Sequence, residues 1–530
     1  MKYPIGIQTF ENIISGGFVY VDKTDMVYSL ATEGKVYFLS RPRRFGKSLL
    51  LSTLKAYFEG QKKLFAGLKI AALEQDWHVH KVFHFDFNGE EFATPGALES
   101  CLKGYLVRWE REYGVVPEEF DSLGARFEQV LKAACERSGR SVVVLVDEYD
   151  KPLLDVLEED SHLLVRNRET LKAFYSVFKR ADEYLRFVFL TGVTKFSQVS
   201  VFSGFNQPKD ISMYDKYEAL CGITEEELHR IFVEPIRDMA AEQGCAEEEM
   251  RQQLKQRYDG YHFGKRLVDI YNPFSVLNAF DSHDIRDYWF STGTPTYLIR
   301  LMNHFHEGID ELTGKYYSLD EFVNYKADTE YPLPMIYQSG YLTIKDYDFR
   351  RNRFLLDFPN NEVKNGFLTL VASNYLHAKN SASNLAQDLT FALEDGELDQ
   401  FRTLLTSFLA SIPYTARRKE SERERERYFQ YTFYLLLRLM SVYAVHLEME
   451  QSEGRVDCVV ETPKYVYIFE FKLDGTAAQA LRQIQAKGYA RSYQADERPI
   501  YLIGVNFSSH TGTVDGWECM PCCDSNRLTS

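Results

Sequence analysis

The sequence contains no apolar run that approaches the roughly 20 residues needed to cross a bilayer as a helix. Its first residues, Met1-Lys2-Tyr3-Pro4, also lack the charged and then apolar layout of a secretory signal. Eight cysteines in 530 residues follow no regular spacing, which argues against a disulfide framework. No internal repeat or long low-complexity linker is present. These absences predict a cytoplasmic protein without a membrane partner.

An excess of positive charge is missing as well. Lys and Arg total 62 and Asp and Glu total 77, which gives a formal net charge of −15. Nucleic-acid affinity depends strongly on neutralising phosphates, so a chain this acidic does not coat DNA or RNA indiscriminately. Any contact with nucleic acid has to come from a local basic surface.

What the sequence does contain is typical of a large globular protein. Hydrophobic residues make up 45% and aromatic residues 15% of the chain, and its length predicts roughly three to four folded units. Short continuous apolar runs, separated by helical stretches, occupy residues 35–40, 82–87, 141–146 and 186–190. Such runs favour a parallel sheet covered by helices on both faces, and therefore an α/β fold.

A phosphate-binding loop is predicted at Ser40-Arg41-Pro42-Arg43-Arg44-Phe45-Gly46-Lys47-Ser48, between the first of these strands and a helix over 47–58. Backbone N–H groups at the start of that helix would bind phosphates. Lys47 would reach the β- and γ-phosphates of ATP, and Ser48 would bind Mg²⁺. Arg41 stands where the usual motif has glycine. Arg43, Arg44, Phe45 and Gly46 complete the predicted loop, with a surface role for the two arginines as the alternative.

The third apolar run ends in Asp147-Glu148, the acidic pair expected of a Walker B strand. Asp147 would hold Mg²⁺ and Glu148 would polarise the attacking water. An acidic loop that merely caps a strand is the alternative. Thr191, at the end of the fourth run, stands where a γ-phosphate sensor is expected. The acidic pair suits water activation better than the transfer of phosphate to a small molecule.

After the predicted ATPase region, the pattern of hydrophobic residues becomes typical of helices. Thr224, with Glu227 three residues later, predicts the start of a helix by a capping box. The predicted organisation is a P-loop domain at 1–220, a helical subdomain at 221–300, a mostly helical connecting region at 301–425, a second α/β domain at 426–515 and a mobile, reduced tail at 516–530. The last α/β domain is predicted to run helix, strand, strand, helix, strand, with its helices at 428–442 and 477–493.

A nuclease centre is predicted in that second domain. Asp457 lies on one strand, and Glu470 and Lys472 lie on one face of the next because alternate residues share a face. This is the layout of the PD-(D/E)XK fold. The carboxylates would bind one or two Mg²⁺ ions, and Lys472 would orient the attacking water. A solvated cross-strand pair is the alternative meaning of Glu-x-Lys.

Several motifs together resemble the bacterial AAA-ATPase-like family, which commonly carries a C-terminal PD-(D/E)XK nuclease-like domain. They are Tyr20-Val21-Asp22-Lys23-Thr24, the loop at 41–48, Val-Asp-Glu-Tyr-Asp at 146–150, Thr-Gly-Val-Thr-Lys-Phe-Ser at 191–197, Tyr258-Asp259-Gly260-Tyr261-His262-Phe263-Gly264, Tyr271-Asn272-Pro273-Phe274-Ser275 and the segment 288–295. The resemblance covers nearly the whole chain and includes an arginine at the position of Arg41.

The resemblance also implies further site residues. Glu448 would be an additional metal ligand, Gln483 occupies the family's glutamine position, and Gln485 and Tyr489 would share a helix face as in RecB-like nucleases. The segment 258–264 has two open interpretations: it shapes or covers the nucleotide site, or it is a turn packed against the ATPase core.

The sequence therefore predicts an ATPase that regulates or positions a metal-dependent nuclease. Its predicted ligands are ATP, Mg²⁺ and DNA, with RNA as a further possibility, and homo-oligomerisation is left open. The alternative function is a nucleotide switch or scaffold whose second domain binds a partner or nucleic acid without cleaving it.

Overall fold

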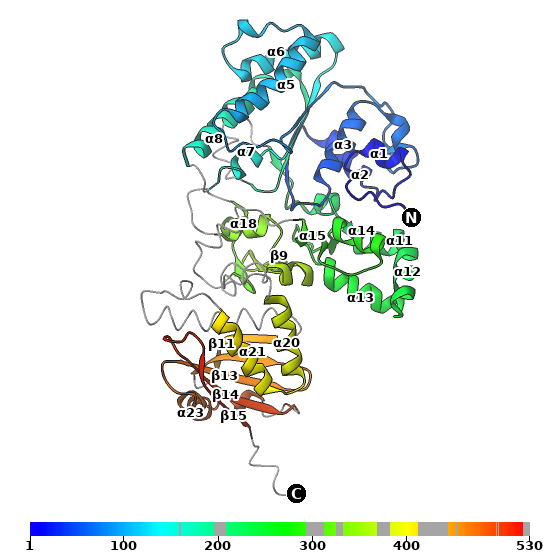
Figure 1. Ribbon diagram of the computed structural model, residues 1–530. Coiled ribbons are helices and arrows are strands. Elements are labelled where there is room, and N and C mark those ends of the chain that lie inside the picture. The colour runs from blue at the N-terminus through cyan, green and yellow to red at the C-terminus, as the bar shows by residue number, and fades with distance from the viewer. Residues whose placement is uncertain are drawn as a thin grey trace. The chain divides into compact units, whose positions relative to one another are not determined.

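The computed structural model describes residues 1–157, 161–195, 208–292, 312–324, 332–367, 382–411, 444–451, 454–493, 496 and 498–522. Side chains are described throughout these ranges except at 161, 382–387, 411, 444–451 and 454–456. The chain forms two compact units, Met1–Val363 and Lys364–Ser530 (Figure 1). Each unit has its own hydrophobic core.

A five-stranded parallel sheet forms the centre of the first unit. Its strands follow the order β2-β3-β4-β1-β5, so β4 lies between β1 and β3. Every residue of β3 is buried, as expected for a strand covered on both faces. The four apolar runs of the sequence are thus confirmed as strands. The strand bounds are β1 Val36–Ser40, β2 Val82–Asp86, β3 Val142–Asp147, β4 Leu185–Gly192 and β5 Lys209–Asp210.

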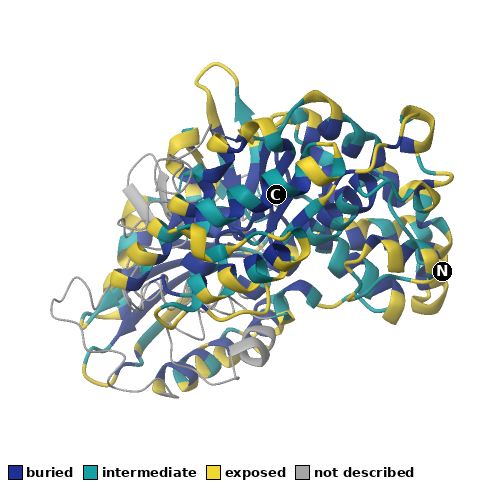
Figure 2. Cartoon of the chain, turned by 90° about the horizontal axis from the view of Figure 1, so that it is seen from above, coloured by how far each residue is buried: buried dark blue, intermediate teal, exposed yellow. Residues whose placement is uncertain are grey.

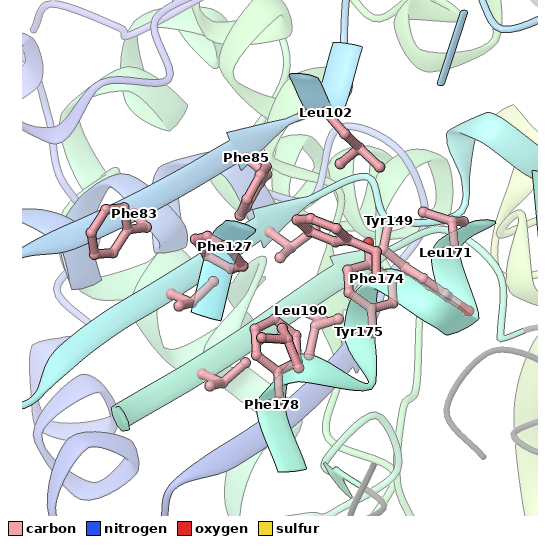
Figure 3. Packing of buried hydrophobic residues seen from close by; sticks show 14 of the residues in the cluster. Phe83, Phe85, Leu102, Phe127, Tyr149, Leu171, Phe174, Tyr175, Phe178 and Leu190 are labelled. Atoms are coloured by element: carbon pink, nitrogen blue, oxygen red, sulfur yellow. The ribbon is translucent and has the colours of Figure 1, made fainter. Parts of the chain in front are cut away.

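Helices cover both faces of this sheet (Figure 1). One face packs against α5, α6 and α8 through an aromatic-rich core, in which Phe85 contacts Phe127 and Phe174 edge-on (Figure 3). The other face packs against α3, whose Phe58 lies 5.0 Å from Phe187 between ring centroids. The helices of this part are α1 Phe10–Ser15, α2 Thr24–Glu33, α3 Lys47–Phe58, α4 Ile70–Leu73, α5 Ala97–Tyr113, α6 Leu123–Ser138, α7 Lys151–Leu154, α8 Ser161–Tyr175 and α9 Val177–Arg180.

The predicted helical subdomain follows within the same unit. Thr224 caps the first helix, and both hydrogen bonds of the predicted capping box are present. A separate cluster of buried apolar side chains holds the helices together. The elements are β6 Ile223–Thr224, α11 Glu225–Ile231, α12 Val233–Gln243, α13 Glu247–Tyr258, β7 Ile270–Tyr271, α14 Pro273–Ser282 and α15 Tyr288–Ser291.

The region after residue 301, predicted to be mostly helical, contains a small sheet as well as the helices α17, α18, α20 and α21. A three-stranded antiparallel sheet of order β8-β10-β9 belongs to the first unit. Its strands are short, and their pairing partners lie up to about 40 residues apart. The periodicity of hydrophobic residues over a short stretch of sequence therefore did not reveal these strands. The elements are β8 Lys315–Tyr317, α17 Leu319–Val323, α18 Leu333–Gln338, β9 Thr343–Asp348 and β10 Arg353–Asp357.

The second unit is built on a five-stranded sheet of order β11-β12-β13-β14-β15, in which β13 and β14 are parallel and the other pairs antiparallel. Helices α20 and α21 pack on one face and α23 on the other. Buried residues gather along the strands of both units, and exposed residues lie on loops and outer helix surfaces (Figure 2). The elements are α20 Ala382–Glu394, α21 Leu398–Ser411, β11 Ala444–Gln451, β12 Gly454–Glu461, β13 Val466–Leu473, α23 Ala477–Lys487, β14 Ile500–Phe507 and β15 Val514–Pro521.

Two strands of this sheet were not predicted. Strand β11 precedes β12, and β15 occupies residues 514–521, where a mobile tail was expected from residue 516. Both are edge strands that mix polar and apolar residues, so they lack the continuous apolar runs of central strands. The predicted helix at 428–442 lies outside the described residues.

Candidate nucleotide-binding and nuclease sites

A tight bend joins β1 to α3. Gly46, the residue before α3, has φ +94°, a left-handed conformation that other residues rarely adopt. No atom lies within 4 Å of the position that a Cβ would take on Gly46, so the backbone conformation, and not lack of space, requires glycine here. Helix α3 begins directly after this bend. The free N–H groups at its N-terminus and the helix dipole favour the binding of an anion there.

The bend lies in the wall of a cavity of about 780 Å³. Gly46, Lys47 and Ser48 contribute to this wall. Glu148, the residue that follows β3, contributes to it as well. A cavity of this size falls within the range that binds small molecules and cofactors. The place where the sequence predicts a triphosphate therefore has room for one.

Two further segments complete the cavity wall. Residues 4–8 form one part of it, and α14 forms another through side chains that include Phe274 and Leu277. The Arg44 guanidinium lies 5.2 Å from the centre of the Phe274 ring. The sequence analysis did not assign either segment to the site, although the motif at 271–275 overlaps the start of α14.

Within the loop, neighbouring residues point in different directions. Arg43 and Arg44 line the cavity. Phe45 instead has a side chain that is only 1% exposed and packs edge-on against Tyr261 and Phe263. The aromatic segment at 258–264 thus packs behind the loop, which favours the interpretation of that segment as a turn packed on the ATPase core.

Arg41, at the position where the general motif has glycine, is fully buried. Its Nη1 donates hydrogen bonds to the carbonyl oxygens of Ser40 at 2.9 Å and Ser212 at 2.6 Å. Its guanidinium also lies 4.1 Å from the centre of the Phe263 ring, which is a cation–π contact. Arg41 therefore ties the loop to the segment after β5 and to the aromatic turn, and its side chain faces away from the cavity.

Lys47 is held by its own loop. Its Nζ donates to the carbonyl oxygens of Arg41 at 2.9 Å and Pro42 at 3.1 Å, and the residue is 6% exposed. These two bonds use two of the three N–H donors of the ammonium group. Because Lys47 also lines the cavity, the ammonium lies at the place where a phosphate oxygen would compete for it.

Asp147, at the end of β3, is buried beside Thr191 of the neighbouring strand. The Thr191 hydroxyl donates to Oδ1 of Asp147 at 2.6 Å, and the backbone N–H of Glu148 donates to the same oxygen at 3.1 Å. Thr191 is fully buried and does not belong to the described wall of the cavity. The structure thus places Thr191 as a support for Asp147 and not at the position of a phosphate sensor.

Glu148 has an unusual backbone conformation and a shifted pKa. It has φ +52° and lines the cavity. Burial raises the pKa of its carboxyl group to about 7, although the nearby positive charge of Lys47 acts in the opposite direction. A carboxyl group with a pKa near neutral pH suits the acceptance of a proton from water.

Asp150 is the third acidic residue of the same motif, and the sequence analysis gave it no role. Its Oδ2 accepts hydrogen bonds from the backbone N–H groups of Val193 at 3.0 Å and Thr194 at 2.6 Å, and from the Thr194 hydroxyl at 2.7 Å. A Cβ on Gly192 would lie 2.6 Å from Oδ1 of Asp150. Asp150 therefore fixes the end of β4 against the loop that carries Glu148.

Trp289 connects the phosphate loop to the end of the first unit. Its indole N–H donates to the carbonyl oxygen of Arg43 at 3.0 Å. Its backbone N–H donates to Glu362 at 2.6 Å, and the Ser275 hydroxyl donates to the other Glu362 oxygen at 2.7 Å. Glu362 is 1% exposed, and burial raises its pKa to about 7. It directly precedes Val363, the last residue of the unit.

The second unit carries three acidic positions in one row across its sheet. The pairing of β11 with β12 places Glu448 opposite Asp457. The pairing of β12 with β13 is recorded as far as Cys458 opposite Phe469, and Asp457 and Glu470 are the next residues on those strands. The backbone thus brings together the residues that the sequence predicted as metal ligands.

Glu470 has a strongly perturbed carboxyl group. It is 1% exposed, and its Oε2 atom has no hydrogen-bond partner. Burial, together with the negative charge of Asp457, raises its pKa to about 8. Lys472 acts in the opposite direction, with its Nζ 3.5 Å from Oε1 of Glu470.

The donor atoms of this row fit a hard divalent cation. Asp457 accepts a hydrogen bond from the backbone N–H of Phe471 at 2.8 Å, which orients its carboxylate. Glu470 offers an oxygen that is buried without a partner, an arrangement that a bound cation would satisfy. Among the described side chains no ready-made group of three metal ligands is found, and the side chain of Glu448 lies outside that description.

The predicted accessory residues lie on and after α23. Gln483 and Gln485 belong to this helix, whereas Gly488 ends it with φ +59°. Tyr489 follows in a short 3-10 turn, Tyr489–Tyr493, and is 1% exposed within the apolar core. Tyr489 and Gln485 therefore do not share a continuous helix face, because a glycine in the left-handed conformation stops the helix between them.

Comparison with known proteins agrees with these two sites. Residues 4–202 match a family described as predicted AAA-ATPase, and residues 424–517 match the PD-(D/E)XK nuclease superfamily. A curated relative from Azotobacter chroococcum mcd 1, "Uncharacterized protein in vnfD 5'region", is 37% identical over 525 residues, covering 97% of this chain and 98% of that protein. The chain belongs to the AAA-ATPase-like family.

Solved structures give a much weaker likeness for this AAA-ATPase-like chain. The Aeropyrum pernix ORC1 protein in complex with DNA matches with a TM-score of 0.24 and 12% identity, covering 66% of this chain and 93% of that one. The Aeropyrum pernix ORC2 protein matches with a TM-score of 0.26 and 13% identity, covering 66% and 94%. Scores this low support no further argument. None of the described helices is long and apolar enough to cross a membrane.

In this AAA-ATPase-like chain, sequence reasoning predicted a phosphate loop and an acidic pair but did not predict the residues that position them. Asp150 belonged to a motif that had been noticed, so a second buried acid could have been inferred. Trp289 and Glu362 are distant in sequence from the loop, and no local pattern connects them to it.

Proposed function

We propose that the first unit binds and hydrolyses ATP and that the second unit is a metal-dependent nuclease whose activity depends on the nucleotide state of the first. One observation carries this proposal. Each unit holds a carboxyl group whose pKa burial raises toward or above neutral pH, that of the half-buried Glu148 to about 7 and that of the buried Glu470 to about 8. Each lies near a lysine of the same predicted site, and such perturbed pairs are typical of functional sites.

For ATP hydrolysis, the bend at Gly46 and the N-terminus of α3 would bind the phosphates. Lys47 would exchange its loop carbonyl partners for phosphate oxygens, and Arg43 and Arg44 would add positive charge. Ser48 and Asp147 would hold Mg²⁺, which neutralises charge on the phosphate oxygens. Glu148 would accept the proton of the attacking water.

For cleavage of a phosphodiester, Asp457, Glu470 and Glu448 would hold the divalent metal. Bound Mg²⁺ would stabilise negative charge on the phosphate. Lys472, whose side chain is 29% exposed, would position the attacking water beside the carboxylates. The substrate class that follows is nucleic acid, with DNA as the primary candidate.

The contacts of Trp289 support the proposed dependence on nucleotide. A phosphate that changes the loop at Arg43 would change the hydrogen bond from the indole, and the same residue is bonded to Glu362 next to the unit boundary. Trp289→Phe keeps the aromatic ring but removes the indole donor. We expect this variant to retain ATP turnover and cleavage while losing most of the stimulation of cleavage by ATP.

Two lysine variants test the two halves separately. Lys47→Ala should abolish ATP turnover, whereas the matched control Lys55→Ala, an exposed lysine of the same helix, should not. Lys472→Ala should abolish Mg²⁺-dependent cleavage and leave ATP turnover intact, with the exposed Lys464→Ala as its control. ATP turnover without cleavage of any DNA or RNA form would contradict the nuclease half.

That outcome would favour the alternative function, a nucleotide switch whose second unit binds nucleic acid or a partner without cutting.

A further inference from the structure

The hairpin formed by β9 and β10 presents an exposed aromatic side chain at its tip. Phe349 is 85% exposed, which is unusual for a large apolar residue in an ordered turn. Asp348 fixes the turn by accepting hydrogen bonds from the backbone N–H groups of Arg350 at 2.9 Å and Arg351 at 3.1 Å. Asn352 closes the turn in the left-handed conformation, with φ +50°. The tip is therefore preorganised.

Three arginines follow this aromatic ring in the hairpin and outnumber Asp346 and Asp348, the two aspartates of β9. Arg350, Arg351 and Arg353 are all exposed, and Arg351 has a side chain that is 80% exposed although it pairs with Asp348. Lys265 lies against the side of the hairpin, with its Nζ 4.4 Å from the centre of the Tyr347 ring. In a chain with a net charge of −15, this is a local basic surface of the kind that nucleic-acid binding would require.

The nearby helix α18 offers no comparable surface for binding nucleic acid. Leu333, Met335 and Ile336 are buried, and Gln338 is only 6% exposed, so α18 is committed to the core of the first unit. Strand β8, which pairs with β10, also exposes Lys315 and Tyr316, so exposed basic and aromatic side chains extend from the hairpin onto the same small sheet. A planar ring flanked by guanidinium groups matches an unpaired base flanked by phosphates.

We propose that the tip of the β9–β10 hairpin, Phe349 to Arg353, binds single-stranded nucleic acid. Phe349 stacks on an unpaired base, and Arg350 and Arg351 contact the phosphates on either side. This inference rests on the proposed function in one respect only, namely that the bound strand is the substrate of the nuclease unit. A lipid surface fits less well, since membrane binding by such a motif needs a broad apolar face and the tip offers one ring.

The test measures the affinity of the full-length chain for a fluorescent 20-nucleotide single strand of DNA, the same strand of RNA, the DNA duplex and anionic phosphatidylserine vesicles. Phe349→Ala should weaken single-strand binding about tenfold through the loss of one stacked base. The double variant Arg350→Ala/Arg351→Ala should weaken it at least as much and lower the slope of log K against log salt by about 1.4, since each contact contributes about 0.7. The duplex should bind more weakly than the single strand.

Matched controls are Phe391→Ala, a 52% exposed phenylalanine of the second unit, and Arg111→Ala, an exposed arginine on α5. These controls should bind as the unaltered chain does, and every variant should keep its thermal midpoint and its ATP turnover in the absence of nucleic acid. Unchanged affinity in both hairpin variants, absence of single-strand binding by the unaltered chain, or a loss confined to vesicle binding would each overturn the proposal.

The Lys472→Ala variant separates this inference from the proposed nuclease activity. If no preparation cleaves nucleic acid but the hairpin variants lose single-strand binding, the inference holds and the nuclease half fails. If cleavage depends on Lys472 while the hairpin variants bind and cleave normally, the nuclease half holds and the inference fails. The relative affinity for DNA and RNA identifies which strand the hairpin prefers.

Discussion

Each candidate site places a carboxyl group near a lysine, but the two sites do so in different ways. In the first unit, Glu148 faces an open cavity of about 780 Å³, and Lys47 is satisfied by loop carbonyls. In the second unit, Glu470 is 1% exposed, has an unpartnered oxygen, and is 3.5 Å from Lys472. The first arrangement is ready for a large anionic ligand. The second holds a proton at neutral pH and requires a cation to displace it.

Among the variants that test this comparison, Glu470→Gln is expected to have the largest effect on activity. The amide keeps the shape of the protonated carboxyl group but cannot replace its proton by a metal. We expect Mg²⁺-dependent cleavage to fall by well over about a hundredfold, because loss of even an outer-shell partner costs 10–100-fold. Glu518→Gln, on the exposed edge strand β15, is the control. Cleavage by Glu470→Gln at the unaltered rate would exclude this carboxyl group as a ligand.

A loss of comparable size is expected from Glu148→Gln in the first unit. Removal of the proton acceptor should lower ATP turnover by about 10²–10⁴-fold while ATP binding remains within a few-fold. In the unaltered chain, turnover should fall as the pH drops below about 7, because the carboxyl group then holds a proton and cannot accept another. A steady-state pH profile and a nucleotide titration measure the two effects. A profile that is flat between pH 5.5 and pH 8 would remove Glu148 from the mechanism.

The stability of the second unit should depend on pH in the direction set by Glu470. Its pKa is about 8 in the folded chain and 4.5 in an exposed carboxyl group, so the folded state binds the proton more tightly. The stabilisation is complete below about pH 4.5 and is lost as the pH rises to about 8. The loss is on the order of a few kcal/mol.

Urea unfolding of the full chain and of Glu470→Gln, at pH 6 and pH 8.5 in EDTA, isolates this contribution. The amide variant should gain stability relative to the unaltered chain at the higher pH, and Mg²⁺ should stabilise the unaltered chain alone. An equal difference between the two proteins at both pH values would show that Glu470 titrates normally.

The smallest effect concerns the loop of the first unit. Arg41→Gly restores the glycine of the general phosphate-loop motif but removes the donors to Ser40 and Ser212 and the contact with Phe263. We expect a loss of about 2 kcal/mol or more in the free energy of unfolding, because buried carbonyl oxygens are left without partners. Arg41→Lys should recover part of that loss. Greater stability of the glycine variant would contradict a structural role for Arg41.

Much of the fold was predictable because its signals are local. The buried strands appear as continuous apolar runs, Gly46 and Lys47 mark the bend before α3, and the capping box of Thr224 marks a helix start. Edge strands such as β11 and β15 lack such runs, and their pairing depends on partners already in place. The small sheet of β8, β9 and β10 was missed for the same reason.

The candidate sites show the same division. Asp457, Glu470 and Lys472 could be predicted because strand alternation and register place them together. The direction of Thr191 toward Asp147 could not be predicted, because both residues end neighbouring strands and only the packing between them decides which way each side chain faces. The burial of Arg41 likewise depends on the segment around Ser212, which is distant in the chain.

The hydrogen bonds of the Lys47 ammonium have a consequence for the proposed turnover of ATP. If a product nucleotide leaves the site, the ammonium can bond to the carbonyl oxygens of Arg41 and Pro42, so no buried charge is left without a partner. We therefore expect product to exchange for new substrate without a separate exchange factor.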